Sequence, residues 1–428
     1  MPNTLASFDR DLVETLEVLK NHAGVKAALQ AVRDRLPDAV ECQKELVLIE
    51  APTHHEEQKA RRYAEMLAQA GLEDVRVDEH FNVWGYVHGT GRTGKSILIE
   101  GHLDTVFAFG DVKGVTTDEQ GRIHCPGICD DTRALAANLN VLWALKSAGL
   151  RPVHDIIFAG TVCEEGLGGT AGMGWLLDSL KNETQVLATI SIDGPTAENF
   201  YANATGIVDW EVEISGPGGH AWLKHGTPSA VQAAGRAIGL IADIEAPETP
   251  KTSFTVSLVE GGQAIHGIAE HAKFSANLRS NSQDVLEKLN DDFLAACRRG
   301  VELEEARWGR PGTLKMEAKK ILAIPAGSQP DNARIIQAAK LVTKAAGVEP
   351  NFLPGGCTNA NTAIAKGYPA VTLGRGGEEF GAHTLAEWFN PEGVWHCEQK
   401  SVLMLLMLSG LDGAAAPLGE TLAPASQH

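Results

Sequence analysis

The sequence predicts an α/β fold: a mixed, mostly parallel sheet with helices on both faces, interrupted by an inserted α+β domain of ferredoxin-like topology. Two observations support this fold class. Strand-like apolar runs alternate with helical patterns in both outer parts of the chain, which is typical of parallel sheets. From about Gly206 the order becomes β-α-β-β-α-β, a unit complete in itself. We therefore expect a discontinuous domain, residues 1–205 and 325–428, and an inserted domain, residues 206–324.

The outer domain begins with helices. Residues 9 to about 71 repeat apolar side chains at helical spacing, and Gly71 is suited to end the last helix. Strands and helices then alternate. We expect strands at residues 75–77, 82–87, 96–100, 154–162, 185–192 and 369–373, and helices at residues 132–149 and 331–346.

The inserted domain shows the alternating apolar and polar pattern of half-buried strands. Its strands are expected at residues 208–214, 252–259, 272–278 and 313–319, and its helices from Thr227-Pro228 and from Ser282. None of its polar clusters resembles a set of metal ligands. The final stretch of the chain, residues 413–428, is rich in Ala, Pro and Gly, which predicts disorder.

Composition narrows the class of protein. A chain of 428 residues exceeds one ordinary core, so two domains are expected. The net charge of −18 argues against nucleic acid or an anionic membrane as a partner. We expect no membrane span and no secretory signal, because the apolar runs are short and the first residues lack a basic and apolar pattern. Seven scattered cysteines favour reduced thiols in a cytoplasmic protein.

Short polar clusters follow the predicted strands of the outer domain. They contain two histidines and several carboxylates: His102 with Asp104, Asp130 with Asp131, Glu164 with Glu165, Asp193, and His383. In an open α/β sheet such strand exits converge on one crevice. Nitrogen and oxygen donors of this kind can hold a pair of Zn²⁺-like ions that activate water. The sequence therefore predicts a metal-dependent hydrolase.

The first two clusters each have a simpler explanation when taken alone. His102 and Asp104 are two residues apart, so the carboxylate could fix the tautomer of the imidazole, but a plain surface or core hydrogen bond is more common. Asp130 and Asp131 precede a helix and could act only as its N-cap. The alternative is that Asp130 bridges two cations, with one oxygen on each. The co-occurrence of all the clusters favours the metal site.

Adjacent glutamates repel each other, so Glu164 and Glu165 by themselves would indicate a surface loop. A cation bound to Glu165 would offset that repulsion. Glu164 would then remain free to act as a general base toward water.

These motifs resemble those of the M20 family of dinuclear zinc peptidases, the aminoacylase and carboxypeptidase clan. The resemblance covers about residues 46–389 and rests on five segments: Gly-His102-Leu-Asp104-Thr, Pro-Gly-Ile-Cys-Asp130-Asp, Cys-Glu164-Glu165-Gly-Leu-Gly, Ser-Ile-Asp193-Gly and Ala-His383-Thr-Leu-Ala-Glu387-Trp. It implies one metal held by His102, Asp130 and Asp193, and another held by Asp130, Glu165 and His383. It also implies that Asp104 orients His102 and that Glu164 is the general base.

The resemblance gives the inserted domain the role of a lid that forms a homodimer. Gly-Gly-His220-Ala resembles the motif whose histidine reaches across the dimer to stabilise the oxyanion, although a polar turn residue would look the same. Asn-Leu-Arg279-Ser resembles the position whose arginine binds a substrate carboxylate, with a surface salt bridge as the alternative.

Three segments expected near the substrate depart from the family pattern, one of which, Asp130-Asp131-Thr132-Arg133, lacks the common Lys. His266 stands where the family usually has Asn, and Gly-Gly-Cys-Thr-Asn359-Ala-Asn replaces the usual Ser-Thr-Asp-Ala-Asn. The predicted function is hydrolysis of amide bonds in short peptides or N-acyl amino acids, using two divalent ions, Zn²⁺ first and Co²⁺ or Mn²⁺ as alternatives. Because of these departures, a non-peptide amide remains a rival substrate. A catalytically silent binding protein is the rival of a different class.

Overall fold

The computed structural model describes residues 8–423 of the chain. The chain divides into two compact units. One, the main unit, runs up to Ala204 and resumes at Ser328, and the other, the inserted unit, spans Thr205–Gly327. Each unit has its own hydrophobic core.

An eight-stranded sheet forms the centre of the main unit. Its order is β1-β2-β6-β3-β7-β16-β8-β15, and β6, β3, β7 and β16 are parallel neighbours. The two edges carry the antiparallel pairs, which makes the sheet mixed and mostly parallel at its centre, as predicted. The strands are β1 (Glu73–Val77), β2 (Val83–Val87), β3 (Lys95–His102), β6 (Asp155–Thr161), β7 (Gln185–Gly194), β8 (Asn199–Tyr201), β15 (Asn351–Leu353) and β16 (Ala370–Gly374).

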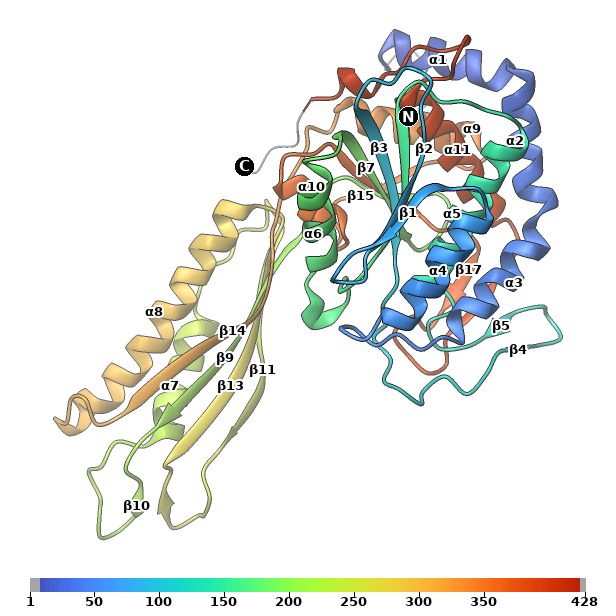
Figure 1. Ribbon diagram of the computed structural model, residues 1–428. Coiled ribbons are helices and arrows are strands. Elements are labelled where there is room, and N and C mark those ends of the chain that lie inside the picture. The colour runs from blue at the N-terminus through green and yellow to red at the C-terminus, as the bar shows by residue number, and fades with distance from the viewer. Residues whose placement is uncertain (1–7, 424–428) are drawn as a thin grey trace. The chain divides into compact units, whose positions relative to one another are not determined.

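Both faces of this sheet are buried because its strands are apolar on both sides. In β3, Ile97 and Ile99 enter one core and Leu98 enters the other, as the two-residue period of a strand requires. Helices cover the two faces, and Figure 1 shows α6 and α10 on one side with α4 and α5 on the other. The first side holds α6 (Ala171–Leu180) and α10 (Ala360–Ala365); the second holds α1 (Arg10–Asn21), α2 (Ala23–Asp34), α3 (Leu36–Val47), α4 (Glu57–Gln69), α5 (Thr132–Ser147), α9 (Arg334–Ala345) and α11 (Trp395–Ser409).

A second, small sheet in the main unit joins segments that are far apart in sequence. It is antiparallel, in the order β17-β18-β5-β4, and was not anticipated from the sequence. Its strands are β17 (Glu378–Phe380), β18 (Trp388–Asn390), β5 (Ile123–His124) and β4 (Thr116–Thr117). The pairing of Trp388 with His124 brings the chain around residue 387 against the turn that precedes α5.

The inserted unit is a four-stranded antiparallel sheet in the order β11-β13-β9-β14, with α7 and α8 packed on one face. Its elements are β9 (Gly206–Ser215), α7 (Ala230–Ala242), β11 (Thr252–Gly261), β13 (His271–Ser280), α8 (Gln283–Trp308) and β14 (Lys315–Ile324). Two short strands, β10 (Gly219–His220) and β12 (Gly267–Ile268), pair with each other at one end of this unit. The predicted β-α-β-β-α-β order is therefore confirmed.

One expectation about the chain's end was wrong. Residues 413–423 are not irregular and detached: Leu411 pairs with Ala415, a 3₁₀ turn spans Gly419–Thr421, and Leu418 is buried against the core. Apolar side chains among the Ala and Pro residues provide that packing. Residues 424–428 lie outside the described part of the chain. None of the helices that the structure describes is long and apolar enough to cross a membrane.

Candidate metal centre

The predicted ligands gather at the carboxyl ends of the central parallel strands. His102 is the last residue of β3, and Asp193 is the second last of β7. Glu164 and Glu165 follow β6, and Asp130 precedes α5. Parallel strands present their carboxyl ends at one edge, so five segments of the main unit meet there. Three overlapping groups of donors result, within each of which the ligand atoms all lie within 4.8 Å of one another.

Asp130 lies at the centre of the cluster. Its Oδ1 is 3.1 Å from Nε2 of His102, and its Oδ2 is 3.2 Å from Nε2 of His383. The same nitrogen of His383 lies 3.0 Å from Oε1 of Glu165, and Nε2 of His102 lies 3.9 Å from Oδ1 of Asp193. The two oxygens of one carboxylate thus face two separate sets of donors.

This donor set fits a pair of divalent ions. Nδ1 of His102 is 2.9 Å from the backbone carbonyl of Asp104, and since a carbonyl only accepts, Nδ1 carries a hydrogen. In a neutral imidazole Nε2 is then a bare lone pair, and it faces the carboxylate of Asp130. Two acceptors approach this closely only when a proton or a cation lies between them. Imidazole and carboxylate groups are the usual ligands of Zn²⁺ and related ions.

The raised pKa values of the clustered groups indicate that the cluster favours positive charge. Burial raises the pKa of Glu164 well above its usual range, and the carboxylates of Asp193, Glu165 and Asp104 raise it further. Burial and then Asp130 raise the pKa of Asp193 to about 8. Hydrogen bonds to Asp130 and Glu165 raise the pKa of His383 to about 10. Without a metal the cluster therefore holds protons, which a bound cation would displace.

Asp104 lies beside His102, and its side chain also holds the turn that carries the two glutamates. Its carboxylate is 3.6 Å from Nδ1 of His102, farther than its own carbonyl. The carboxylate oxygens accept the backbone N–H groups of Glu164 and Glu165, both at 3.0 Å, and one also accepts the hydroxyl of Thr53 at 2.9 Å. Asp104 is fully buried. Its backbone thus contacts His102, while its side chain fixes the turn that carries both glutamates.

Glu387 holds the turn that carries Asp130. It is buried, and its carboxylate accepts the backbone N–H groups of Gly127 at 2.8 Å, Cys129 at 2.7 Å and Asp130 at 3.3 Å. The small sheet brings Glu387 to this position. The sequence placed Glu387 in a motif without a role. The feature of the sequence that could have indicated this role is a glutamate four residues after the predicted ligand His383.

Arg375 was missed by the sequence analysis. It directly follows β16, is buried, and its Nη1 lies 3.1 Å from Oδ1 of Asp130 and 3.0 Å from Oδ1 of Asp193. Arg375 also follows a strand, but an arginine is not a metal ligand, so the pattern of histidines and carboxylates does not indicate it. The positive charge of this buried guanidinium offsets part of the negative charge of the surrounding carboxylates.

A cavity of about 160 Å³ opens over the cluster. Its lining consists of four carboxylates, one histidine and a few neighbours: Asp130, Glu164, Glu165, Asp193, His383, Tyr201, Gly356, Cys357 and Thr358. Asn359, predicted to bind substrate, is not part of this lining. Its amide donates to Oε2 of buried Glu100 at 2.9 Å and to Oγ1 of Thr161 at 2.8 Å. The structure thus points this side chain into the packed interior, because Glu100 needs donors there.

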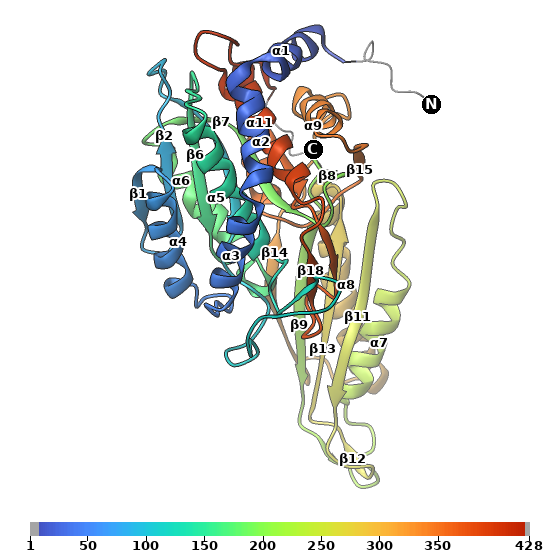
Figure 2. The same ribbon diagram turned by 90° about the vertical axis from the view of Figure 1, so that its right-hand side faces the viewer.

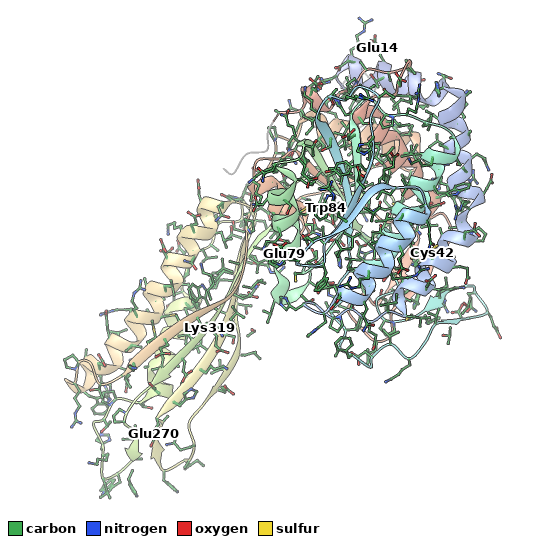
Figure 3. All side chains as sticks on the ribbon, viewed as in Figure 1. Glu14, Cys42, Glu79, Trp84, Glu270 and Lys319 are labelled. Atoms are coloured by element: carbon green, nitrogen blue, oxygen red, sulfur yellow. The ribbon has the colours of Figure 1, made fainter. Side chains whose placement is uncertain are left out.

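The three other predicted residues lie in the inserted unit. His220 and His266 are neighbours at its β10–β12 end, where the N–H of Ala221 donates to the carbonyl of His266 at 2.9 Å. Glu270 marks the same end of the sheet in Figure 3. Arg279 lies near the far end of β13, and its Nε donates to Asn277 at 3.0 Å. Eight strand residues from His271 correspond to about 26 Å, so Arg279 is remote from the two histidines within this unit.

Known proteins share both the sequence pattern and the fold. A family model described as Peptidase family M20/M25/M40 matches residues 98–405. The N-acetyldiaminopimelate deacetylase of Bacillus pumilus is 25% identical over 238 residues, which are 50% of this chain and only 61% of the deacetylase. Carboxypeptidase G2 of a Pseudomonas species is 26% identical over 321 residues, 71% of each chain.

Two solved structures establish the likeness of the fold. A tripeptidase from Staphylococcus aureus superposes with a TM-score of 0.73 at 22% identity, covering 86% of this chain and 97% of that one. A dinuclear metal binding peptidase of the M20 family from Bacillus subtilis gives a TM-score of 0.65 at 15% identity, covering 88% and 99%. Because the family model spans most of the chain, including all five segments of the cluster, this protein belongs to the M20/M25/M40 peptidase family.

Proposed function

We propose that the main unit binds two divalent metal ions and hydrolyses an amide bond in short peptides or N-acyl amino acids. The observation that carries the proposal is the position of Asp130, whose two carboxylate oxygens each face a different histidine at 3.1 and 3.2 Å. A carboxylate shared in this way is what a two-metal site requires, with ions about 3.5–4 Å apart.

The proposed ligand sets follow from the two sides of Asp130. The first set comprises His102, Asp130 and Asp193; the second comprises Asp130, Glu165 and His383. When bound, the ions supply Lewis-acid polarisation of the carbonyl and a water of lowered pKa. The cavity above these groups gives a small polar substrate access to them.

Glu164 is proposed as the general base. It lies within the donor cluster, is only 7% exposed, and has no hydrogen-bond partner among the proposed metal ligands. Its backbone N–H is fixed by Asp104, so its carboxylate has a defined position. Glu164 would take a proton from the attacking water and return it to the leaving amine. A base must lie within hydrogen-bond reach of both, which the cavity lining permits.

The inserted unit is proposed to form a homodimer and to supply His220 as an oxyanion donor, with Arg279 and His266 contacting substrate. His220 is exposed, and its Nδ1 accepts the N–H of Trp222 at 3.2 Å, which leaves Nε2 able to donate. The separation of Arg279 from His220 within one inserted unit means that these two residues would serve a single substrate only from different chains. Sedimentation of the protein tests the dimer, and His220→Ala should lower kcat more than it raises KM.

The relatives differ in the substrates that their names indicate, so they do not select one substrate class for the proposal. One relative is a deacetylase, one a carboxypeptidase, and one similar structure is a tripeptidase. All three names describe cleavage of an amide. A panel of di- and tripeptides, N-acyl amino acids and non-peptide amides decides among them. Turnover confined to non-peptide amides would favour the rival substrate, to which the altered His266 points.

The decisive experiment compares the wild-type protein with Glu164→Gln at full metal loading. The proposal expects unchanged metal content and a loss of turnover of about 10²–10⁴-fold, the usual contribution of a positioned acid or base. Glu14→Gln, an exposed glutamate on α1 (Figure 3), is the matched control and should be fully active. Full turnover by Glu164→Gln would refute the assignment. Absence of any turnover in the metal-loaded wild type would instead favour a silent binding protein.

Metal dependence has its own test. Treatment with a chelator should abolish turnover, and Zn²⁺, Co²⁺ or Mn²⁺ should restore it, since nitrogen and oxygen donors accept all three. Comparing the restored rates identifies the most effective ion. Turnover that survives complete metal removal would contradict the proposed mechanism.

A further inference from the structure

Arg375 contacts one side of the metal cluster and not the other. Its Nη1 lies 3.1 Å from Oδ1 of Asp130 and 3.0 Å from Oδ1 of Asp193. Oδ1 of Asp130 also faces His102, and Oδ1 of Asp193 is the oxygen of that carboxylate nearest to His102. The guanidinium therefore donates hydrogen bonds to both carboxylate oxygens that the first proposed ligand set offers to a metal.

The second ligand set has no such cation. It consists of Oδ2 of Asp130, Oε1 of Glu165 and Nε2 of His383. Within residues 8–423 no arginine or lysine forms an ion pair with Glu165 or with Oδ2 of Asp130. The two sets share Asp130 but differ in whether a fixed positive charge already touches their oxygens.

Arg375 is held firmly in this position. The other side of its guanidinium meets Glu379, with Nε 3.0 Å from Oε2 and Nη2 3.3 Å from Oε1. Its backbone N–H donates to the carbonyl of Gly194 at 2.8 Å. The side chain is only 4% exposed, and a guanidinium keeps its charge at all ordinary pH values. Arg375 is thus a permanent cation that cannot turn away into solvent.

We propose that Arg375 makes the two metal sites unequal: the second set binds its ion tightly and fills first, whereas the first set binds weakly because Arg375 already neutralises its carboxylates. The inference rests on the proposed two-metal function and deepens it. Like charges a few ångströms apart repel strongly in a buried site. The protein should therefore pass through a one-metal state, and its content of metal should depend on the free metal concentration.

Titration of the metal-free protein with Zn²⁺, against a competing chelator, tests this directly. The wild type should show two binding steps with dissociation constants that differ by about tenfold or more, since repulsion acts on one step only. Arg375→Gln should tighten the weaker step by a similar factor and leave the tighter step unchanged. Arg375→Lys, which keeps the charge, should retain the weak step. Arg151→Gln, an exposed arginine that precedes β6 and pairs with Asp412, is the matched control.

Variants of the proposed ligands show which binding step belongs to which metal site. His383→Ala should remove the tighter step, whereas His102→Ala should remove the weaker one. These titrations leave Arg375 unchanged, so they decide the matter even if variants at that position do not fold. Two equal steps in the wild type, or an unaltered weak step in folded Arg375→Gln, would overturn the proposal. Absence of bound metal under all conditions would overturn the proposed function as well, which separates the two failures.

Discussion

Replacing Asp104 with Asn tests whether this carboxylate holds the two glutamates in position. Asp104 accepts three hydrogen bonds with its side chain: from the N–H of Glu164 at 3.0 Å, from the N–H of Glu165 at 3.0 Å and from the hydroxyl of Thr53 at 2.9 Å. Burial raises the pKa of Asp104, but His102, and then the backbone N–H groups of Glu164 and Glu165, lower it below its usual value overall. The carboxylate is therefore charged at neutral pH.

The expected cost follows from the number of acceptors lost. Asn has one carbonyl oxygen, which can replace the oxygen that accepts from Glu165 and Thr53. Its NH₂ group then faces the N–H of Glu164, so one hydrogen bond to a charged group is lost and two donors oppose each other. Such bonds contribute about 1.5–3 kcal/mol, and a buried unsatisfied donor costs about 1–3 kcal/mol. We expect a loss in unfolding free energy of about 2–4 kcal/mol, since these costs overlap.

Urea unfolding of the chelator-treated protein measures this change without a contribution from metal binding. Asp118→Asn is the matched control, because Asp118 also accepts two backbone N–H groups, from Gln120 at 3.0 Å and Arg122 at 2.9 Å. Both reach its Oδ1, which the carbonyl oxygen of an Asn can replace, in a half-buried turn that water can enter. That variant should lose less than about 1 kcal/mol. If Asp104→Asn were as stable as the control and as active as the wild type, the positioning role of Asp104 would be refuted.

Three further outcomes are expected. Glu387→Gln should weaken metal binding about 10- to 100-fold, because a neutral amide cannot accept all the N–H groups around Asp130; unchanged zinc affinity would contradict this. Zinc affinity should rise with pH, most steeply below about 8, where metal must displace a proton from Asp193 as well as from His383, and less steeply up to about 10, where only His383 still holds one; calorimetry in two buffers would detect the released protons, and a flat profile would speak against it. Asn359→Ala should cost about 1–3 kcal/mol in urea by removing a donor to Glu100, with KM nearly unchanged; a large rise in KM at wild-type stability would restore its predicted contact with substrate.

The fold was predictable where residues repeat with a clear period. The strand over 96–100 was recognised from its apolar run, and the structure extends it by one residue at its start and two at its end, so that His102 itself ends β3. The helix α11 was not recognised, because its residues are buried on all sides and leave no amphipathic period. The short strands of the small sheet, β4, β5, β17 and β18, are too brief to give a pattern at all.

For the candidate site as well, residues with a local sequence pattern were predictable, and those placed by distant segments were not. Histidines and carboxylates at strand exits predicted the clustered donors, because parallel strands bring their carboxyl ends to one edge of the sheet. Partners from distant segments could not be found this way. Glu387 reaches the Asp130 turn through the pairing of β18 with β5, and Arg375 reaches Asp193 through the neighbouring positions of β16 and β7. The inward orientation of Asn359 depends on Glu100, which looks like an ordinary strand residue in the sequence.

Crystals soaked to saturation with Zn²⁺ and measured at the zinc absorption edge test the central claim most directly. The account predicts two anomalous peaks about 3.5–4 Å apart, one on each side of the Asp130 carboxylate, with His102 beside one and His383 beside the other. A single peak, no peak, or peaks away from Asp130 would contradict it.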